Sequence, residues 1–265
     1  MTTGLTLILP AYNESERIDP ALDELFGYLR RRDDHARDGA PGAAALPATI
    51  DILVVDDGST DDTVARVERR PEASGSLPGV DLRVLRVPHG GKGAAVRAGM
   101  LAAAGDLVVF ADADMATPPD QIPLLVAALA DNEVALGSRI QVDGSDMRAS
   151  QPGYRRLLGK AFHLLASLWV VGPVQDTQCG FKGFTRAAAQ DLFSRQRITS
   201  IVFDVELIYL ARRLRYRWAI VPIQWSDKRG SRMRAGARLA LQVAWDLFRI
   251  PLIHRGDRRS SAGQT

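Results

Sequence analysis

The 265-residue sequence has a single cysteine, Cys179, so no disulfide can form within the chain. It contains no run of about 20 apolar residues, the length that a membrane-spanning helix needs. The N-terminal stretch MTTGLTLILPAYNE lacks a basic region, and its apolar run is too short for a signal peptide. These absences predict a cytosolic protein in a reducing compartment, with Cys179 as a small buried residue.

Two common phosphate-binding patterns are also missing. The glycine-rich stretch GGKGAAVRAG (90–99) matches neither the P-loop spacing G-x-x-x-x-G-K-[ST] nor the dinucleotide fingerprint G-x-G-x-x-G. It does offer backbone N–H groups and a lysine, which suit a phosphate. The sequence therefore argues against those two classes of site and leaves Lys92 as a candidate nucleotide-sugar contact.

Charge is spread unevenly along the chain. The composition, 46% hydrophobic and 25% charged, is that of one globular domain with a modest net charge of +3. Residues 228–259, however, hold nine lysines and arginines against two aspartates, a local surplus of seven. This surplus indicates an anionic partner: a membrane surface, a phosphate or a nucleic acid. Nucleic acid is the least favoured, because no nucleic-acid-binding motif accompanies the basic residues.

Strand and helix patterns alternate in the first part of the chain. Strands are expected at 5–10, 50–59, 80–88 and 106–114, and helices within 15–32, 59–70 and 90–105. Ser15 is the expected N-cap of the first helix. This order predicts an α/β fold with a mostly parallel sheet. Ligands of such sheets bind outside the carboxyl ends of the strands, where we expect Tyr12-Asn13-Glu14, Asp56-Asp57 and Asp112-Asp114 to meet.

The second half is less regular. Its patterns predict strands at 134–140 and 217–227, a loop, strand and helix within 176–193, and helices at 154–171, 203–216 and 234–253. The last helix is basic and amphipathic, so a C-terminal amphipathic helical segment is expected to follow the main domain.

The stretch VVFADADMATPPD (108–120) leads an apolar strand into two carboxylates. In a continuing strand, Asp112 and Asp114 project from one face. Their repulsion is relieved by a shared proton or by a cation, and Mg²⁺ or Mn²⁺ suits carboxylate oxygens together with substrate phosphates. The alternative is a solvated turn, because Asp and TPP are also turn residues. The polar residues at the other strand ends favour the metal site.

The motifs LPAYNESERI, LVVDDGSTDDT, GKGAAVRAGM, FADAD and GSR together resemble those of the family 2 glycosyltransferases, whose fold is GT-A. The stretches FADADMATPPD, DTQCGFKGFTRAAAQDLF and FDVELIYLARR are similar to the branch that acts on dolichyl and other polyprenyl phosphates. The resemblance implies a GT-A domain over 1–232, followed by a basic amphipathic helix and tail over 233–265. It further implies inverting transfer of a hexose from a nucleotide sugar to a lipid phosphate, with Mg²⁺ or Mn²⁺ as cofactor.

The resemblance also implies roles for the matching residues. The base and ribose would contact Pro10, Tyr12, Glu14, Val54 and Asp56. The diphosphate and metal would meet Asp112, Ala113 and Asp114, with Asp114 as the main ligand. Phosphates would contact Arg139, and a loop with Lys228 and Arg232 would close over the diphosphate.

Departures from the family pattern bear on the sugar and the product. Some relatives have a glutamine two residues after the second aspartate, where this chain has Ala116. The glucosyl branch has a small residue at this position, within the stretch D-A-D-G-A-T. The glycine of that stretch is replaced by Met115 in this chain. This difference favours UDP-glucose over GDP-mannose as donor. The Q-x-x-R-W signature of processive synthases is absent, which argues against a polymerase.

A lipid-phosphate acceptor changes what the site must supply. A phosphate monoester has a second pKa of about 6, so it is ionised near neutral pH and needs no general base. It needs cations instead, and the candidates are Arg139, Lys182 and the 228–234 loop. Asp176 is expected to orient the acceptor or a neighbouring arginine, or else to cap a loop.

A polyprenyl acceptor also requires contact with a bilayer. Segments 161–174 and 234–259 are too short to span one, and we expect them to lie on its inner surface; the alternative is a core helix with a solvated face. The sequence is also compatible with two other functions. One is a family 2 transferase with a soluble acceptor, and the other is a module that only binds a nucleotide sugar or nucleic acid.

Overall fold

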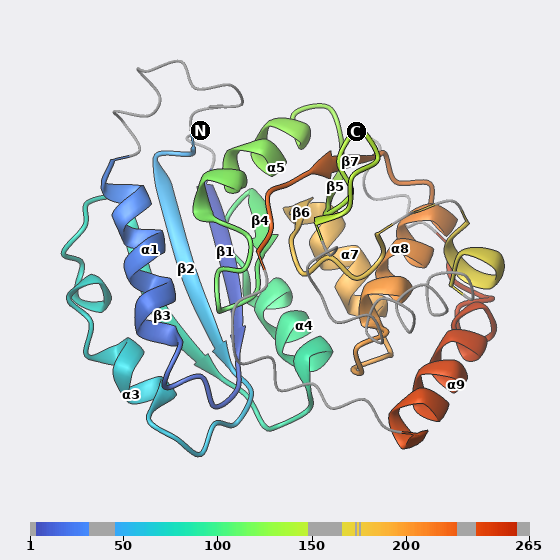
Figure 1. Ribbon diagram of the computed structural model, residues 1–265, viewed down its shortest axis with the longest axis horizontal. Helices are drawn as coiled ribbons and strands as arrows, with labels where there is room; N and C mark the ends of the chain where they lie inside the picture. Colours follow the sequence, from blue (N-terminus) through green and yellow to red (C-terminus); the bar gives the residue numbers. More distant parts are fainter. Residues whose placement is uncertain are drawn as a thin grey trace.

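The computed structural model describes residues 4–31, 46–147, 166–172, 174, 176–226 and 237–258, without the side chains of 167, 168 and 237–240. Their centre is a seven-stranded sheet with the order β3-β2-β1-β4-β6-β5-β7 (Figure 1). The strands are β1 (Gly4–Ala11), β2 (Thr49–Asp56), β3 (Val80–Arg86), β4 (Leu107–Phe110), β5 (Val134–Ser138), β6 (Lys182–Thr185) and β7 (Trp218–Pro222).

The sheet is mixed but mostly parallel, as the sequence predicts. Strands β3, β2, β1 and β4 pair in parallel, as do β5 and β7, whereas β6 runs antiparallel to both β4 and β5. The chain moves outward from β1 to β3 and then returns to place β4 on the other side of β1. This reversal creates a switch point between the carboxyl ends of β1 and β4, where α/β sheets bind ligands.

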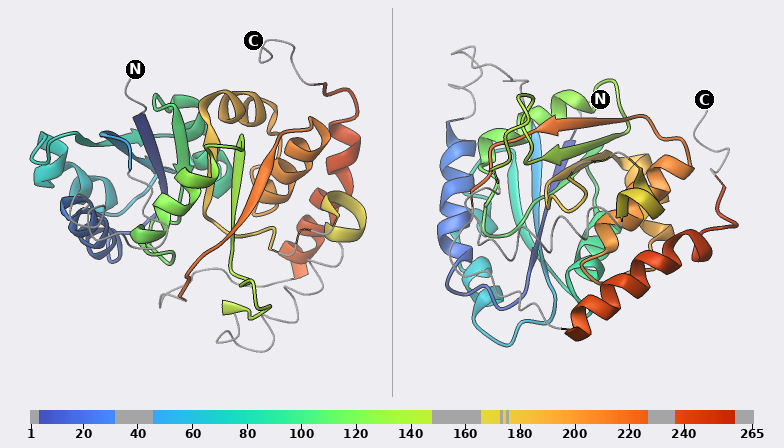
Figure 2. Two further views of the ribbon diagram at one scale, coloured as in Figure 1. Left: turned by 90° about the horizontal axis from the view of Figure 1, so that it is seen from above. Right: turned by 45° about the vertical axis from the view of Figure 1, so that its right-hand side comes forward.

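Helices cover both faces of the sheet (Figures 1 and 2). One face carries α1 (Ile18–Arg30), α3 (Thr63–Glu68) and α5 (Ile122–Ala128). The other carries α4 (Lys92–Ala102), α7 (Arg186–Arg195) and α8 (Phe203–Arg213), and α9 (Ala237–Ile253) packs on α8. Short helical turns are η1 (Pro71–Ser74), η2 (Pro119–Gln121) and the π-helical η4 (Ser167–Val171).

Two apolar cores result, one on each side of the sheet. Along β1, Leu7 and Leu9 face the core under α1, while Ile8 faces the core under α4. Side chains alternate across a strand, so a strand that is covered on both faces is apolar at most positions on both sides. This burial explains the continuous apolar runs of β1 and β2.

The structure corrects three details of the predicted elements. Helix α1 begins at Ile18 rather than after Ser15, and its N-cap, Arg17, makes no side-chain capping bond. Strand β4 ends at Phe110, so Asp112 and Asp114 lie in the turn that follows it and not on the strand. Helix α5 was not predicted, because the stretch TPP before it suggested a turn; Pro123 sits in its first turn, where proline is tolerated. Most of the helix predicted at 154–171 lies outside the described residues.

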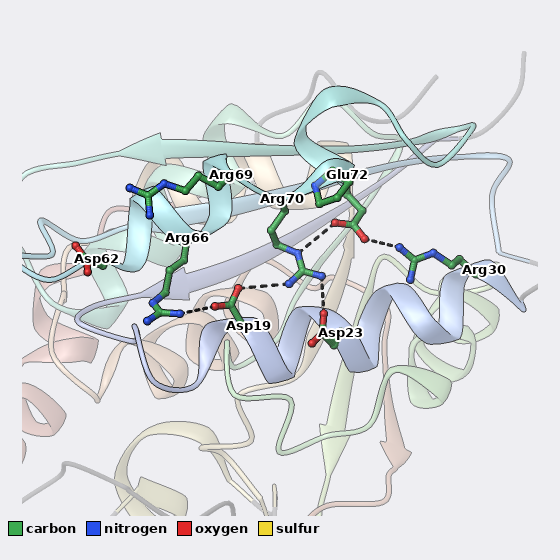
Figure 3. A pocket seen from close by; sticks show the side chains of 9 residues that line it. Asp19, Asp23, Arg30, Asp62, Arg66, Arg69, Arg70 and Glu72 are labelled. Carbon is green, nitrogen blue, oxygen red and sulfur yellow. Dashed lines mark hydrogen bonds and ion pairs between the residues drawn. The ribbon is translucent and has the colours of Figure 1, made fainter.

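An open cavity of about 580 Å³ lies between α1, α3 and η1 (Figure 3). Its charges are largely paired with one another: Arg70 binds Asp23 at 2.7 Å and Glu72 at 3.2 Å, and Arg30 binds Glu72 at 2.5 Å. None of the residues that the sequence predicts for the site lines this cavity. We therefore assign the network to holding α1 against α3 and η1.

Candidate active site

The loops after β1 and β2 are locked together at the carboxyl end of the sheet. The backbone N–H of Asn13 donates to Ser59 Oγ at 2.9 Å, and Asn13 Oδ1 accepts from the N–H of Thr60 at 2.8 Å. Asn13 has a φ of 53°, a left-handed conformation that asparagine tolerates better than most residues. Asp56 accepts from the N–H of Ser59 at 3.2 Å. The motifs PAYNE and DDGST therefore form one rim with Tyr12, Glu14 and Asp56 in place.

A stacked aromatic pair stands on this rim. The rings of Tyr12 and His89 lie 4.3 Å apart between centroids, and Tyr12 is 41% exposed. Asp57 lies against His89, whose Nδ1 is 2.9 Å from Asp57 Oδ2 and 3.0 Å from the Asp57 carbonyl oxygen. The Asp57 carboxylate also accepts from the N–H groups of Gly90 and Gly91 at 2.8 and 2.9 Å. The sequence patterns placed Asp57 on this rim without giving it a role, and they did not indicate His89 as a site residue. The only sequence signal was their place at a strand end and next to the glycine-rich turn.

Two carboxylates follow β4 across the switch point. Asp112 Oδ1 lies 2.5 Å from Lys92 Nζ at the start of α4, and Asp114 Oδ2 lies 3.4 Å from Arg17, which itself pairs with Glu14 at 2.6 Å. Burial and the charge of Asp112 raise the pKa of Asp114. Desolvation acts to lower the pKa of Lys92, but the charges of Asp112, Asp204 and Asp114 and the hydrogen bond to Asp112 together outweigh it, and the pKa is raised. Negative charge is thus concentrated here and only partly offset.

Gly180 lies directly beside the Asp112 carboxylate, which a side chain at this position would displace. A Cβ at Gly180 would lie 2.7 Å from the Asp112 Cγ, closer than side-chain atoms approach. The loop before β6 therefore reaches the carboxylate through a residue without a side chain. Gly180 was not among the predicted site residues, although the CGF stretch that contains it belongs to a motif quoted above.

Arg139 and Asp176 form a buried pair beyond β5. Arg139 Nε and Nη2 donate to the two Asp176 oxygens at 2.8 and 2.6 Å, and the Arg139 N–H donates at 2.9 Å. Burial acts to lower the pKa of Arg139, but the hydrogen bonds and charge of Asp176 raise it above its ordinary value. The guanidinium also lies 5.5 Å from the centre of the Trp225 ring. Asp176 thus orients a neighbouring arginine, one of the roles considered for it.

Two of the residues predicted for the site, Lys182 and Val54, are buried. The Lys182 side chain is 0% exposed, and Nζ donates to Asp204 at 2.6 Å and to the Cys179 carbonyl at 2.5 Å, so it lies in the core and not at the rim. Val54 is also buried, on the α1 side of the sheet. Burial raises the pKa of the Cys179 thiol to about 12, in line with a structural cysteine. Lys228 and Arg232 lie outside the described residues.

Within the described ranges, no three His, Cys, Asp or Glu residues are grouped as a metal cage. Asp112 and Asp114 supply two carboxylates, and Ala113 lies between them with its side chain buried. Two carboxylates are typical of Mg²⁺ sites that take their remaining ligands from water and substrate phosphates. The rim therefore fits a metal that arrives with a diphosphate.

Residues 6–193 match the family Glycosyl transferase family 2. This chain belongs to that family. The enzyme is 39% identical to the dolichyl-phosphate beta-glucosyltransferase of Drosophila melanogaster, over 93% of this chain and 74% of the relative. It is 36% identical to a dolichyl-phosphate beta-glucosyltransferase of Trichomonas vaginalis, over 94% of this chain and 71% of the relative. It is 34% identical to the human dolichyl-phosphate beta-glucosyltransferase, over 88% of this chain and 70% of the relative.

Solved structures support the fold. Glucosyl-3-phosphoglycerate synthase from Mycobacterium tuberculosis, in complex with Mn²⁺, UDP and glucosyl-3-phosphoglycerate, has a TM-score of 0.61 at 21% identity, covering 98% of this chain and 82% of that one. Residues 1–349 of TarS from S. aureus have a TM-score of 0.55 at 18% identity, covering 96% and 66%. At these identities the likeness shows the fold alone, and it confirms the GT-A architecture of this glycosyltransferase.

Proposed function

We propose that this glycosyltransferase moves glucose from UDP-glucose to dolichyl phosphate or another polyprenyl phosphate. The observation that carries the proposal is the carboxylate pair Asp112 and Asp114 at the switch point, with Lys92 and Arg17 beside it. Such a group of charges is suited to a nucleoside diphosphate with its metal. The names of curated relatives at 30–39% identity support glucose as the sugar and a dolichyl phosphate as the acceptor.

In this proposal the rim after β1 and β2 holds the nucleotide. Tyr12 offers an exposed ring, backed by His89, on which a base can stack. Pro10 and Glu14 lie at or just after the end of β1, and Asp56 lies at the end of the neighbouring β2. Asp57 fixes the Gly90-Gly91 turn, so the platform and the Lys92 turn are held by one carboxylate.

Asp112 and Asp114 fit Mg²⁺ or Mn²⁺ by their chemistry. The raised pKa of Asp114 reflects burial and the charge of Asp112, and a divalent cation would relieve both. When bound, the ion neutralises charge that develops on the leaving nucleoside diphosphate. Lys92 is placed to share that task, since its ammonium group already lies against Asp112.

In this proposal Arg139 binds the acceptor phosphate. A lipid phosphate is ionised near neutral pH and can attack without a base, provided that a cation aligns it. Asp176 holds the Arg139 guanidinium in one orientation, and Trp225 lies beside it. The roles proposed for Lys228 and Arg232 stay predictions. Lys182 is left out of the acceptor site because Asp204 and the protein core enclose it.

Turnover by the purified chain tests the donor and acceptor together. With Mn²⁺, a polyprenyl phosphate and radiolabelled UDP-glucose, we expect label in an acid-labile lipid extract. GDP-mannose in place of UDP-glucose should give at most background. Label that stays in the aqueous phase with a phosphorylated soluble acceptor would contradict the lipid assignment, and no transfer from any nucleotide sugar would refute the proposal.

We also infer peripheral contact with the cytoplasmic face of a membrane. None of the described helices is long and apolar enough to cross one. Helix α9, however, directs Leu241, Trp245, Phe248 and Leu252 to the surface, and Trp245 is 61% exposed. The ring of Trp169 in η4, 56% exposed, stacks on Phe248 at 5.9 Å (Figure 2 shows η4 beside α9). Exposed tryptophan and phenylalanine on a helix with nearby arginines suit an anionic lipid surface.

Flotation with anionic vesicles tests this contact. The wild-type chain is expected to float, and the double variant Trp245→Ala/Phe248→Ala should lose most of that binding because it loses its interfacial aromatics. Ile220→Ala, which removes an exposed apolar side chain on β7, is the matched control and should float normally. Equal flotation of wild type and the double variant would count against α9 as the contact.

A further inference from the structure

The loop between α7 and α8, residues 196–202, joins α9 to the turn that carries Lys92. On the α4 side, the N–H of Gly93 donates to the Thr199 carbonyl at 3.1 Å, and Gln196 Nε2 donates to the Gly93 carbonyl at 3.0 Å. A Cβ at Gly93 would lie 2.7 Å from the Thr199 oxygen. The two backbones therefore touch directly, and a shift of Thr199 must shift the start of α4.

The same loop is held from the other side by α8 and α9. Ser200 Oγ donates to Asp246 Oδ2 of α9 at 2.6 Å, and Asp246 is buried. Glu206 of α8 is fully buried and accepts from the N–H groups of Arg197 and Ile198 at 2.8 and 2.9 Å.

The end of α9 contributes a second attachment. His254 Nε2 lies 2.7 Å from Glu206 Oε1, and Nδ1 lies 2.5 Å from Asp257. The buried His254 thus reaches the loop through Glu206, while Asp246 reaches it through Ser200. Both polar attachments lie on the inner side of α9, opposite its exposed aromatics.

We propose that Ser200 and Asp246 are positioning residues for donor binding, which hold the 196–202 loop so that Thr199 sets the turn bearing Lys92. The seating of α9 is thereby coupled to the donor site over the path Asp246, Ser200, Thr199, Gly93 and Lys92. The inference rests on the proposed function in one respect, namely that Lys92 meets the donor diphosphate. A surface that repositions α9 would then change donor affinity without touching the donor.

The test is the dissociation constant of UDP measured by calorimetry in the presence of Mn²⁺. Ser200→Ala is expected to weaken UDP binding about three- to tenfold, because the loop loses one of its two attachments to the α9 segment. Ser194→Ala is the matched control: it removes a hydroxyl that donates to the Asp191 carbonyl at 2.8 Å near the end of α7, and should leave affinity unchanged. Asp246→Ala removes the α9 partner of the same hydrogen bond and should weaken UDP binding at least as much.

The decisive comparison repeats Ser200→Ala in a Lys92→Met background. If the loop acts through Lys92, the second change should alter affinity less than about twofold there, a non-additive result. The proposal would be overturned if Ser200→Ala weakened UDP binding equally in both backgrounds. It would also be overturned if Ser200→Ala had no effect in the chain that keeps Lys92. Thermal unfolding midpoints of each variant separate misfolding from mispositioning. Wild-type chain that does not bind UDP with Mn²⁺ would refute the donor assignment itself, whereas normal UDP binding without a Ser200 effect refutes only this inference.

Discussion

Replacing Asp114 with asparagine is expected to abolish metal-dependent transfer while the chain still folds. Asparagine keeps the shape of the side chain but removes a charge that would hold the cation, so turnover should fall by about 100- to 1000-fold. The raised pKa of Asp114 means that the folded state binds its proton more tightly than the unfolded state does. Ionised Asp114 therefore opposes folding in the metal-free protein above its unfolded pKa, and the variant should unfold at the same temperature or higher.

Two measurements check this expectation. Turnover is compared with and without Mn²⁺, and the unfolding midpoint is followed as Mn²⁺ and UDP are added, because a ligand stabilises only the protein that binds it. Wild type should gain thermal stability and Asp114→Asn should gain little. Asp131→Asn, an exposed aspartate on the turn after α5, is the matched control and should behave as wild type. Turnover by Asp114→Asn at the wild-type rate would contradict the metal assignment.

Changing Arg139 to lysine should reduce transfer to the lipid phosphate while the donor still binds. A lysine keeps the positive charge, but it cannot reproduce the two-pronged pairing with Asp176 or lie flat beside Trp225. The partly unpaired Asp176 should also lower the free energy of unfolding by about 1–3 kcal/mol. We expect kcat with a polyprenyl phosphate to fall at least about tenfold, since misalignment of the attacking group is costly.

The readout that separates acceptor from donor is the dissociation constant of UDP with Mn²⁺, which should stay within about twofold of wild type. Arg195→Lys is the matched control, because Arg195 donates through Nε and Nη2 to Asp191 at 2.9 and 2.7 Å away from the rim. An equal loss of donor binding and turnover in Arg139→Lys would assign Arg139 to the donor diphosphate instead of the acceptor.

Much of the fold follows from local patterns in the sequence. Strands covered on both faces are apolar at most positions, so β1, β2 and β4 are recognisable from their composition alone. Strands alternating with helices imply parallel pairing, and parallel strands bring their carboxyl ends to one edge. For this reason the motifs ending in Glu14, Asp56 and Asp114 could be placed on a common rim, and together they indicated the family.

The tertiary structure decided which polar and charged side chains meet. Lys92 and Asp112 are 20 positions apart, Arg139 and Asp176 are 37 apart, and Ser200 and Asp246 are 46 apart. No local pattern encodes such pairs, because they depend on which strands become neighbours, and the antiparallel β6 lies between β4 and β5. That insertion buries Lys182 against Asp204 and brings Gly180 onto Asp112. The sequence by itself determined the rim and its chemistry, and the long-range packing of the sheet determined which residues of that rim can act.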